Sequence, residues 1–272
     1  MNTRKLQSGT ACVLKWSAMR PDVIDLNQFY ASPLGQVTRR LIRRRIREIW
    51  PNTTGLRVLG MGYATPFLRP FRDEAERLIA FMPAPQGVVR WPHEEPGLVA
   101  LTDETELPLE DSSIDRVVMV HALENSEQVR PMLREVWRVL ASGGRVIVVV
   151  PNRRGIWARV ESTPFGHGYP FSPRQLTRLL RETMFSPMLA VHALYMPPTG
   201  WRTLIRTATA LEKLGNRWSQ VVSGILVVEA SKQIYAMTPE IARRDRKRQP
   251  RVALVAGGTP RGAAARAGPT TG

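Results

Sequence analysis

Short apolar runs alternate with amphipathic stretches through the middle of the chain. Five of these runs predict strands buried in a sheet, because turn or loop residues follow each of them: residues 56–61, 77–82, 98–102, 114–121 and 145–150. Between the last two runs, apolar residues share one helix face over residues 127–140. Strands that alternate with helices predict an α/β fold, in which helices cover both faces of a parallel sheet.

The pattern extends on both sides of this central region. Before it, apolar residues recur at helical spacing from Phe29, and Pro51 ends that helix. After it, Ser172 and Pro173 predict a helix start, since serine caps a helix and proline lacks an N–H that would be unpaired there. The other expected elements are helices at 67–76, 173–184 and 203–214, and strands at 189–195 and 221–229.

Three regions follow from this pattern. Residues 1–28 have no clear period and form an N-terminal extension. Residues 29–238 form the α/β domain. Residues 239–272 are dominated by Arg, Gly, Ala, Pro and Thr without apolar periodicity, so we expect a basic disordered tail.

Composition narrows the class of protein. Of the 272 residues, 43% are hydrophobic and 23% charged, which suits one globular domain with tails. Cys12 is the single cysteine, so no disulfide or thiolate cluster can form within the chain, and the histidines lack ligand spacing; we expect no metal. The apolar stretch near the N-terminus is too short for a signal peptide, and no run approaches the roughly 18 residues of a membrane span. A cytoplasmic protein is the expectation.

The net charge of +16 is concentrated in two arginine-rich blocks, at 39–47 and 243–251. Such blocks could attract phosphate backbones or acidic lipid. The alternative is a solvated helix face and a disordered tail, which we favour because no stacking aromatic residues interleave with either block. Nucleic acid is therefore a possible partner but is not predicted.

Three segments carry a family resemblance: RVLGMGYATP at 57–66, LPLEDSSIDRVVMVHALE at 107–124 and LREVWRVLASGGRVIVVVPN at 133–152. Their order and content resemble class I S-adenosylmethionine (SAM)-dependent methyltransferases of the type 11 kind. The resemblance implies a Rossmann-like fold with a doubly wound seven-stranded sheet, mostly parallel, whose last strand is antiparallel. It also implies SAM as cofactor and transfer of its methyl group to an acceptor, most simply a small molecule.

The turn after the first strand is the expected cofactor cradle. Gly60, Gly62 and Ala64 keep it free of bulky side chains, so that a cofactor could lie against the backbone near a helix N-terminus. The family turn reads Asp-x-Gly-x-Gly-x-Gly. Here the matching residues are Gly60, Gly62, Ala64 and Pro66, so the acid and the last two glycines are absent.

The resemblance implies further cofactor contacts at the ends of the second and third strands. Met82 stands where the family has an acid for the ribose hydroxyls, which methionine cannot bind. Asp103 and Glu104 follow the third strand, where the family uses an acid to receive the adenine amino group; the alternative for Asp103 is a turn cap. Asp115 lies at the opposite end of the sheet, so we expect it to be structural.

The candidate catalytic residues end the fourth and fifth strands. His121 could act as a base near neutral pH or be a hydrogen-bonded rim residue. Asn152 could face a methyl acceptor or be an ordinary loop residue. The loop 161–171, rich in aromatic residues and glycines, is either a lid or a crossover packed on the sheet. Two functions remain open: a SAM-dependent methyltransferase, or a non-catalytic binding or regulatory protein of this fold that has lost SAM binding.

Overall fold

The computed structural model describes residues 20–93, 96–199, 212 and 223–233. Its strands are β1 (Arg57–Gly62), β2 (Arg77–Pro83), β3 (Val99–Thr102), β4 (Ile114–Val120), β5 (Leu140–Pro151), β6 (Phe185–Ala193) and β7 (Ile225–Lys232). Its helices are α2 (Val23–Ala31), α3 (Pro33–Ile49), α4 (Thr65–Leu68), α5 (Val129–Val139) and α6 (Pro173–Glu182), with 3₁₀ helices η1 (Arg69–Phe71), η2 (Trp157–Arg159) and η3 (Pro164–Gly166).

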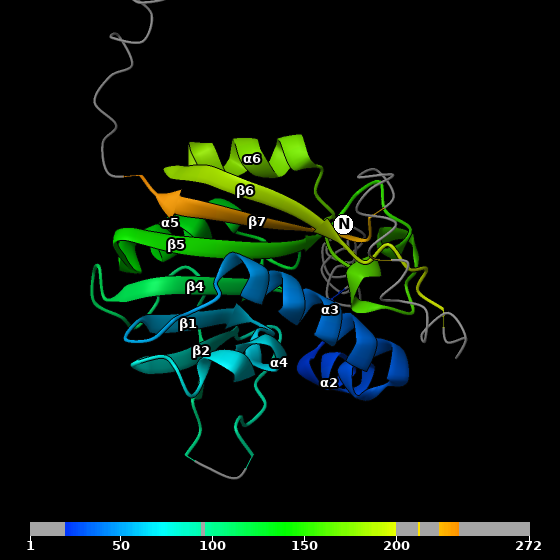
Figure 1. The fold of residues 1–272 in the computed structure, drawn as a ribbon, viewed down its shortest axis with the longest axis horizontal. Coiled ribbons are helices and arrows are strands. Elements are labelled where there is room, and N and C mark those ends of the chain that lie inside the picture. The colour runs from blue at the N-terminus through cyan, green and yellow to red at the C-terminus, as the bar shows by residue number, and fades with distance from the viewer. Residues whose placement is uncertain (1–19, 94–95, 200–211, 213–222, 234–272) are drawn as a thin grey trace, which may run out of the picture. The chain divides into compact units, whose positions relative to one another are not determined.

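The strands form one sheet in the order β3-β2-β1-β4-β5-β7-β6 (Figure 1). Neighbouring strands are parallel except at β7, which runs antiparallel to both β5 and β6. The predicted fold class, with seven strands and an antiparallel last strand, is confirmed. Ile225 at the start of β7 pairs with Pro151 and with Ala193, so β5 and β6 end at the edge where β7 begins.

Helices cover both faces of the sheet. On one face, α2, α3 and α4 pack on alternate strand residues such as Val118 and Val149. On the other, α5 and α6 pack on the intervening residues, among them Met119 and Val148. Both sets of strand side chains are buried, which explains why these strands are apolar at nearly every position instead of alternating.

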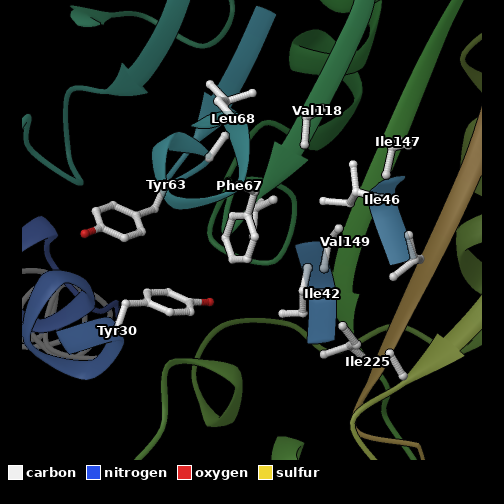
Figure 2. Close-up of a cluster of buried hydrophobic side chains, with 14 of the residues drawn as sticks. Tyr30, Ile42, Ile46, Tyr63, Phe67, Leu68, Val118, Ile147, Val149 and Ile225 are labelled. Atoms are coloured by element: carbon white, nitrogen blue, oxygen red, sulfur yellow. The ribbon is translucent and has the colours of Figure 1, made fainter. Parts of the chain in front are cut away.

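The layer that contains α3 positions the candidate site. Ile42 and Ile46 of α3 are fully buried and lie beside Ile147 and Val149 of β5 (Figure 2). Burying one such side chain stabilises the fold by about 1.5–3 kcal/mol. Ahead of α3, α2 contributes Tyr30 to the same cluster, so this helix is anchored to the sheet.

The N-terminal helices differ from the prediction of one helix that begins near Phe29. Asp22 caps α2 by accepting hydrogen bonds from the amides of Ile24 and Asp25, six residues before the expected extension ends. Ser32 is extended and caps α3, where Pro33 occupies the first turn. Residues 23–28 therefore lie within the folded unit.

The bounds of other helices also differ from the prediction. The predicted helix at 67–76 is wrong: α4 ends at Leu68 and η1 follows, since Pro70 cannot donate the hydrogen bond that an α-helix needs there. The capped start of α6 is confirmed, with Ser172 and Gln175 forming a reciprocal capping box. The predicted helix at 203–214, apart from residue 212, and the tail at 239–272 lie outside the described residues. Within the described part of the chain, no helix is long and apolar enough to cross a membrane.

Candidate functional site

The candidate site lies where β1 and β4 end side by side. Gly62 pairs with Val120, and the chain then turns away on both strands. Ligands of open parallel sheets bind at this carboxyl edge. Gly62 has a φ of 70°, and a Cβ there would stand 2.5 Å from the carbonyl oxygen of Val120. The glycine is therefore required by the close approach of the two strand ends.

A buried polar triad follows β4. His121 is 1% exposed and adopts a left-handed φ of 52°. Its Nε2 lies 2.7 Å from the hydroxyl of Tyr30, and its Nδ1 lies 3.0 Å from Oε1 of Glu124. The side chains of His121 and Glu124 have no exposed surface. The rim histidine predicted from the sequence is thus a hydrogen-bonded, enclosed group.

Tyr30, which forms the triad with His121 and Glu124, and the neighbouring Tyr63 both keep their phenols protonated at neutral pH. Burial, followed by the charge of Glu124, raises the pKa of Tyr30 well above its usual value. Burial also raises the pKa of Tyr63 to about 12. A neutral Tyr30 can donate its proton to Nε2 of His121, and Nδ1–H of His121 then donates to Glu124.

Gln86 closes the edge from the other side. It lies in the loop after β2, and its Nε2 donates to the carbonyl oxygen of His121 at 3.2 Å. The same oxygen accepts from Nδ2 of Asn125 at 3.1 Å. Because β1 lies between β2 and β4, the Gln86 side chain crosses the carboxyl end of β1. The carbonyl of Gln86 also accepts from the amide of Val23 at 2.8 Å, which attaches α2 to this loop.

Aromatic rings fill the space around the triad. Tyr63, in the turn after β1, stacks on Tyr30 with ring centroids 5.8 Å apart and an interplanar angle of 15° (Figure 2). Phe67 meets Tyr30 edge-on at 5.5 Å, and Phe165 lies 4.8 Å from the His121 ring. The rings of Tyr30, Tyr63, Phe67 and Phe165 are almost completely buried.

The expected cofactor residues meet at this edge without forming an open cradle. Ala64 and Met82 are completely buried, and Gly60 is buried on β1 between them. No acid follows β2 in place of the ribose ligand, because Met82 and Pro83 end that strand. With Gln86 and Tyr30 across the edge, the described arrangement does not fit SAM.

The acids after β3 are engaged elsewhere. Asp103 accepts from the amide of Thr105 at 2.8 Å and from its hydroxyl at 2.7 Å, and these bonds lower the pKa of Asp103. The carboxylate of Glu104 accepts from the hydroxyl of Ser126, while burial raises its pKa. The geometry of Asp103 is that of a turn cap.

Asn152 lies apart from the triad. It is 2% exposed, and its Nδ2 donates to the backbone and side-chain oxygens of Ser223 at 2.9 and 3.0 Å. Its Oδ1 accepts from the amide of Arg154 at 3.2 Å. These bonds tie the end of β5 to the segment before β7 and do not reach His121.

The loop 161–171 lies against the triad. Phe165 is buried against His121, and the amide of Tyr169 donates to the carbonyl of Glu124 at 2.8 Å. An open hollow of about 630 Å³ separates this loop from α2, with Asp25, Phe29 and Glu161 among its lining residues. In the described arrangement the part of the loop around Phe165 is packed on the sheet, as the second of the two sequence-based alternatives predicts.

Sequence reasoning missed Tyr30 and Gln86. Tyr30 follows Leu26 by four residues, and Asp22 supplies a helix cap, so a helix start before Phe29 was readable from the sequence. Gln86 offered no such signal, because its contact with His121 spans 35 residues.

Three of the six arginines in the first block are paired with acids. Arg44 and Arg45 bind Glu48, and Arg47 binds Glu74 in a bidentate contact of 2.7 and 2.8 Å. This part of the helix surface carries less free positive charge than the sequence suggested. The second block, at 243–251, lies outside the described residues.

Comparison with known proteins identifies the class of fold. Residues 58–148 match the model of a methyltransferase domain family. A SAM-dependent methyltransferase from Archaeoglobus fulgidus is 20% identical and covers 71% of this chain and 94% of its own, with a TM-score of 0.52. A counterpart from Mesorhizobium loti is 16% identical, covers 69% and 96%, and has a TM-score of 0.53. A search of curated proteins found no match.

The described part of the chain therefore has the class I methyltransferase fold. Residues 58–148, from β1 into β5, match a methyltransferase domain model, in the region where the sequence motifs carried the resemblance.

Proposed function

We propose that the protein is a SAM-dependent methyltransferase that acts on a small-molecule acceptor in the cytoplasm. The observation that carries this proposal is the match to a methyltransferase domain over 58–148, the region whose strands build the carboxyl edge. Gly62 and the buried His121–Glu124 pair stand at that edge.

SAM is the cofactor that this family predicts, and when bound it would supply a methyl group already activated by the sulfonium. The protein would then have to align an acceptor and, for some acceptors, remove a proton. We assign the proton-accepting role to Nε2 of His121, which Glu124 holds through Nδ1 and which becomes available only when the hydroxyl of Tyr30 moves away. Asn152 is proposed to support the acceptor side through its contacts with Ser223.

The first test is cofactor binding by the full chain. Calorimetry with S-adenosylhomocysteine and SAM is expected to give one site per chain. A ligand at 100 times its dissociation constant should stabilise the fold by about 2.7 kcal/mol in a thermal-shift experiment. ATP is the control, because a chain with a net charge of +16 also attracts anions without specificity.

A second candidate is a non-catalytic protein of this fold that binds or regulates a partner. Two observations favour it: Met82 in place of a ribose acid, and Gln86 across the end of β1. Absence of heat at millimolar SAM, in the wild type and in variants designed to open the edge, would select this candidate.

A further inference from the structure

We propose that Gln86 and Tyr30 form a latch that holds α2 across the carboxyl edge, and that a ligand enters the edge only when this latch opens. The latch regulates the site of the proposed methyltransferase, so its role in cofactor entry rests on that function. Its existence as a conformational device does not, because it is built from contacts within the chain.

The first half of the latch is Gln86. Its side chain is 8% exposed and reaches from the loop after β2 to the carbonyl of His121 after β4. Its backbone carbonyl holds the first residue of α2 through the amide of Val23. One residue therefore joins β2, β4 and α2 over the end of β1.

The second half of the latch is Tyr30 near the end of α2. Its hydroxyl bonds His121 at 2.7 Å, and its ring stacks on Tyr63 in the turn that the cofactor would need. Tyr30 is 2% exposed, while Ile24 on the same helix is 60% exposed. The helix thus depends on a few inward contacts, chiefly those of Leu26 and Tyr30.

The closed arrangement leaves buried oxygens unpaired. Oε1 of Gln86, Oε2 of Glu124 and Oδ1 of Asn125 have no hydrogen-bond partner among the described residues. Buried polar atoms without partners are uncommon in folded proteins and weaken the arrangement that buries them. For Gln86 the closed position is therefore not the arrangement that best satisfies its side chain, because opening the latch would expose Oε1 to water.

The acceptors that the latch leaves behind define what can replace it. When Gln86 and Tyr30 move away, the carbonyl oxygen of His121 loses a donor and Nε2 of His121 loses the hydroxyl of Tyr30. A ligand in their place must bring N–H or O–H donors to satisfy these buried acceptors. An aminoacyl nucleoside with an ammonium group meets this requirement.

The test uses Tyr30→Phe, which keeps the ring and removes the hydroxyl, and Gln86→Ala, which removes the bridge. Gln128→Ala and Arg174→Ala are controls at exposed positions away from α2. Hydrogen exchange of the α2 amides is measured on the full chain without ligand. We expect exchange at α2 to quicken about tenfold in each latch variant and to stay unchanged in the controls. Unchanged exchange in both latch variants would overturn the latch.

Calorimetry with S-adenosylhomocysteine on the same variants tests the role in entry. A closed state lowers the apparent affinity by the fraction of open molecules, so the latch variants should bind about tenfold more tightly than the wild type. Faster exchange with unaltered affinity would refute the role in entry and leave the methyltransferase standing. Faster exchange without binding by any variant at millimolar ligand would instead refute the proposed function.

Discussion

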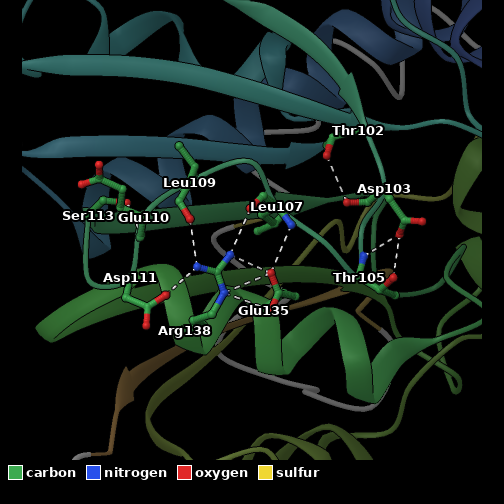
Figure 3. A network of polar contacts seen from close by, with 10 residues as sticks. All are labelled: Thr102, Asp103, Thr105, Leu107, Leu109, Glu110, Asp111, Ser113, Glu135 and Arg138. Carbon is green, nitrogen blue, oxygen red and sulfur yellow. Dashed lines mark hydrogen bonds and ion pairs between the residues drawn. The ribbon is translucent and has the colours of Figure 1, made fainter.

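At the scale of single residues, Arg138 shows how one side chain holds two elements together. Its guanidinium donates to the carboxylates of Glu135 and Asp111 and to the carbonyls of Leu107 and Leu109 (Figure 3). Only arginine has enough donors in a fixed fork to serve these acceptors at once. Arg138 stands in the last turn of α5, within one of the three segments that carry the family resemblance.

Replacing Arg138 with methionine should lower the free energy of unfolding by about 1–3 kcal/mol, because two carbonyls and Glu135 lose their donor. Asp111→Asn should cost less than about 1 kcal/mol, since the Asp111 side chain is 76% exposed. Urea unfolding measures both. Equal losses in the two variants would contradict the role given to the carbonyl contacts.

Glu74 gives a prediction about acid stability. Its bidentate bond to Arg47, with further bonds from Thr53, lowers its pKa from 4.5 to about 2. A carboxyl group whose pKa is lower in the folded state stabilises the fold at pH values above its unfolded pKa. This stabilisation is lost as the pH falls through the folded pKa. Glu74→Gln should therefore have a lower free energy of unfolding than the wild type at pH 7. We call this difference the gap, and it should close between pH 4.5 and 2.

Chemical unfolding at several pH values measures the gap for Glu74→Gln. In an Arg47→Met background the largest cause of the lowered pKa is gone. The gap and its pH dependence should then shrink. A gap that persists at pH 2 would show that Glu74 acts through packing.

At the scale of elements, the strands were predictable and the short helices were not. The run at 145–150 is apolar because both faces of β5 are buried, and no helix pattern competes with it. In contrast, α4 ends after four residues because Pro70 follows in η1. α2 was missed although Asp22 signals a helix start, because Leu26 and Tyr30 alone give a weaker period than the apolar residues of α3.

Gly35 explains why α2 and α3 pack closely at Ser32. A Cβ at Gly35 would stand 1.9 Å from the carbonyl oxygen of Phe29, which is backbone and cannot move aside alone. Gly35→Ala should therefore displace α2 while leaving the sheet folded.

Limited proteolysis is expected to cut the Gly35→Ala variant within α2 at protease concentrations that leave the wild type intact. Arg40→Ala, an exposed position further along α3, is the control. Equal cleavage of all three proteins would show that the α2–α3 contact absorbs the extra methyl group.

At the scale of the whole molecule, a buried carboxylate joins the first helices to the last strand. Glu229 of β7 is 5% exposed and accepts from Nε1 of Trp50, at the end of α3, at 2.8 Å. Arg145 of β5 donates to the same oxygen at 3.2 Å. The two ends of the described fold are thereby joined across 179 residues.

Glu229→Leu should lower the free energy of unfolding by about 1–3 kcal/mol, because it leaves the indole N–H of Trp50 buried without an acceptor. Glu229→Gln keeps an oxygen for Trp50, and Arg145 is 39% exposed to water, so this variant should lose less than about 1 kcal/mol. Guanidinium unfolding compares them. A larger loss in the glutamine variant would assign the stabilisation to the ion pair.

The sequence predicted where the candidate site lies but not that its residues are enclosed. The sequence placed Gly62 and His121 at the carboxyl edge, because each directly follows a buried strand. Their enclosure depends on Tyr30, which is 91 residues from His121. Contacts of this range leave no periodic trace in one sequence.

The antiparallel strand β7 has a consequence for redesign. Since β5 and β6 end where β7 begins, Pro151, Ala193 and Ile225 lie together at one edge of the sheet. Residues inserted beyond Ala193 or before Ile225 would extend from that edge without a change in the pairing of β6 with β7. These two strand ends are therefore natural graft points for altering which molecules this scaffold accepts.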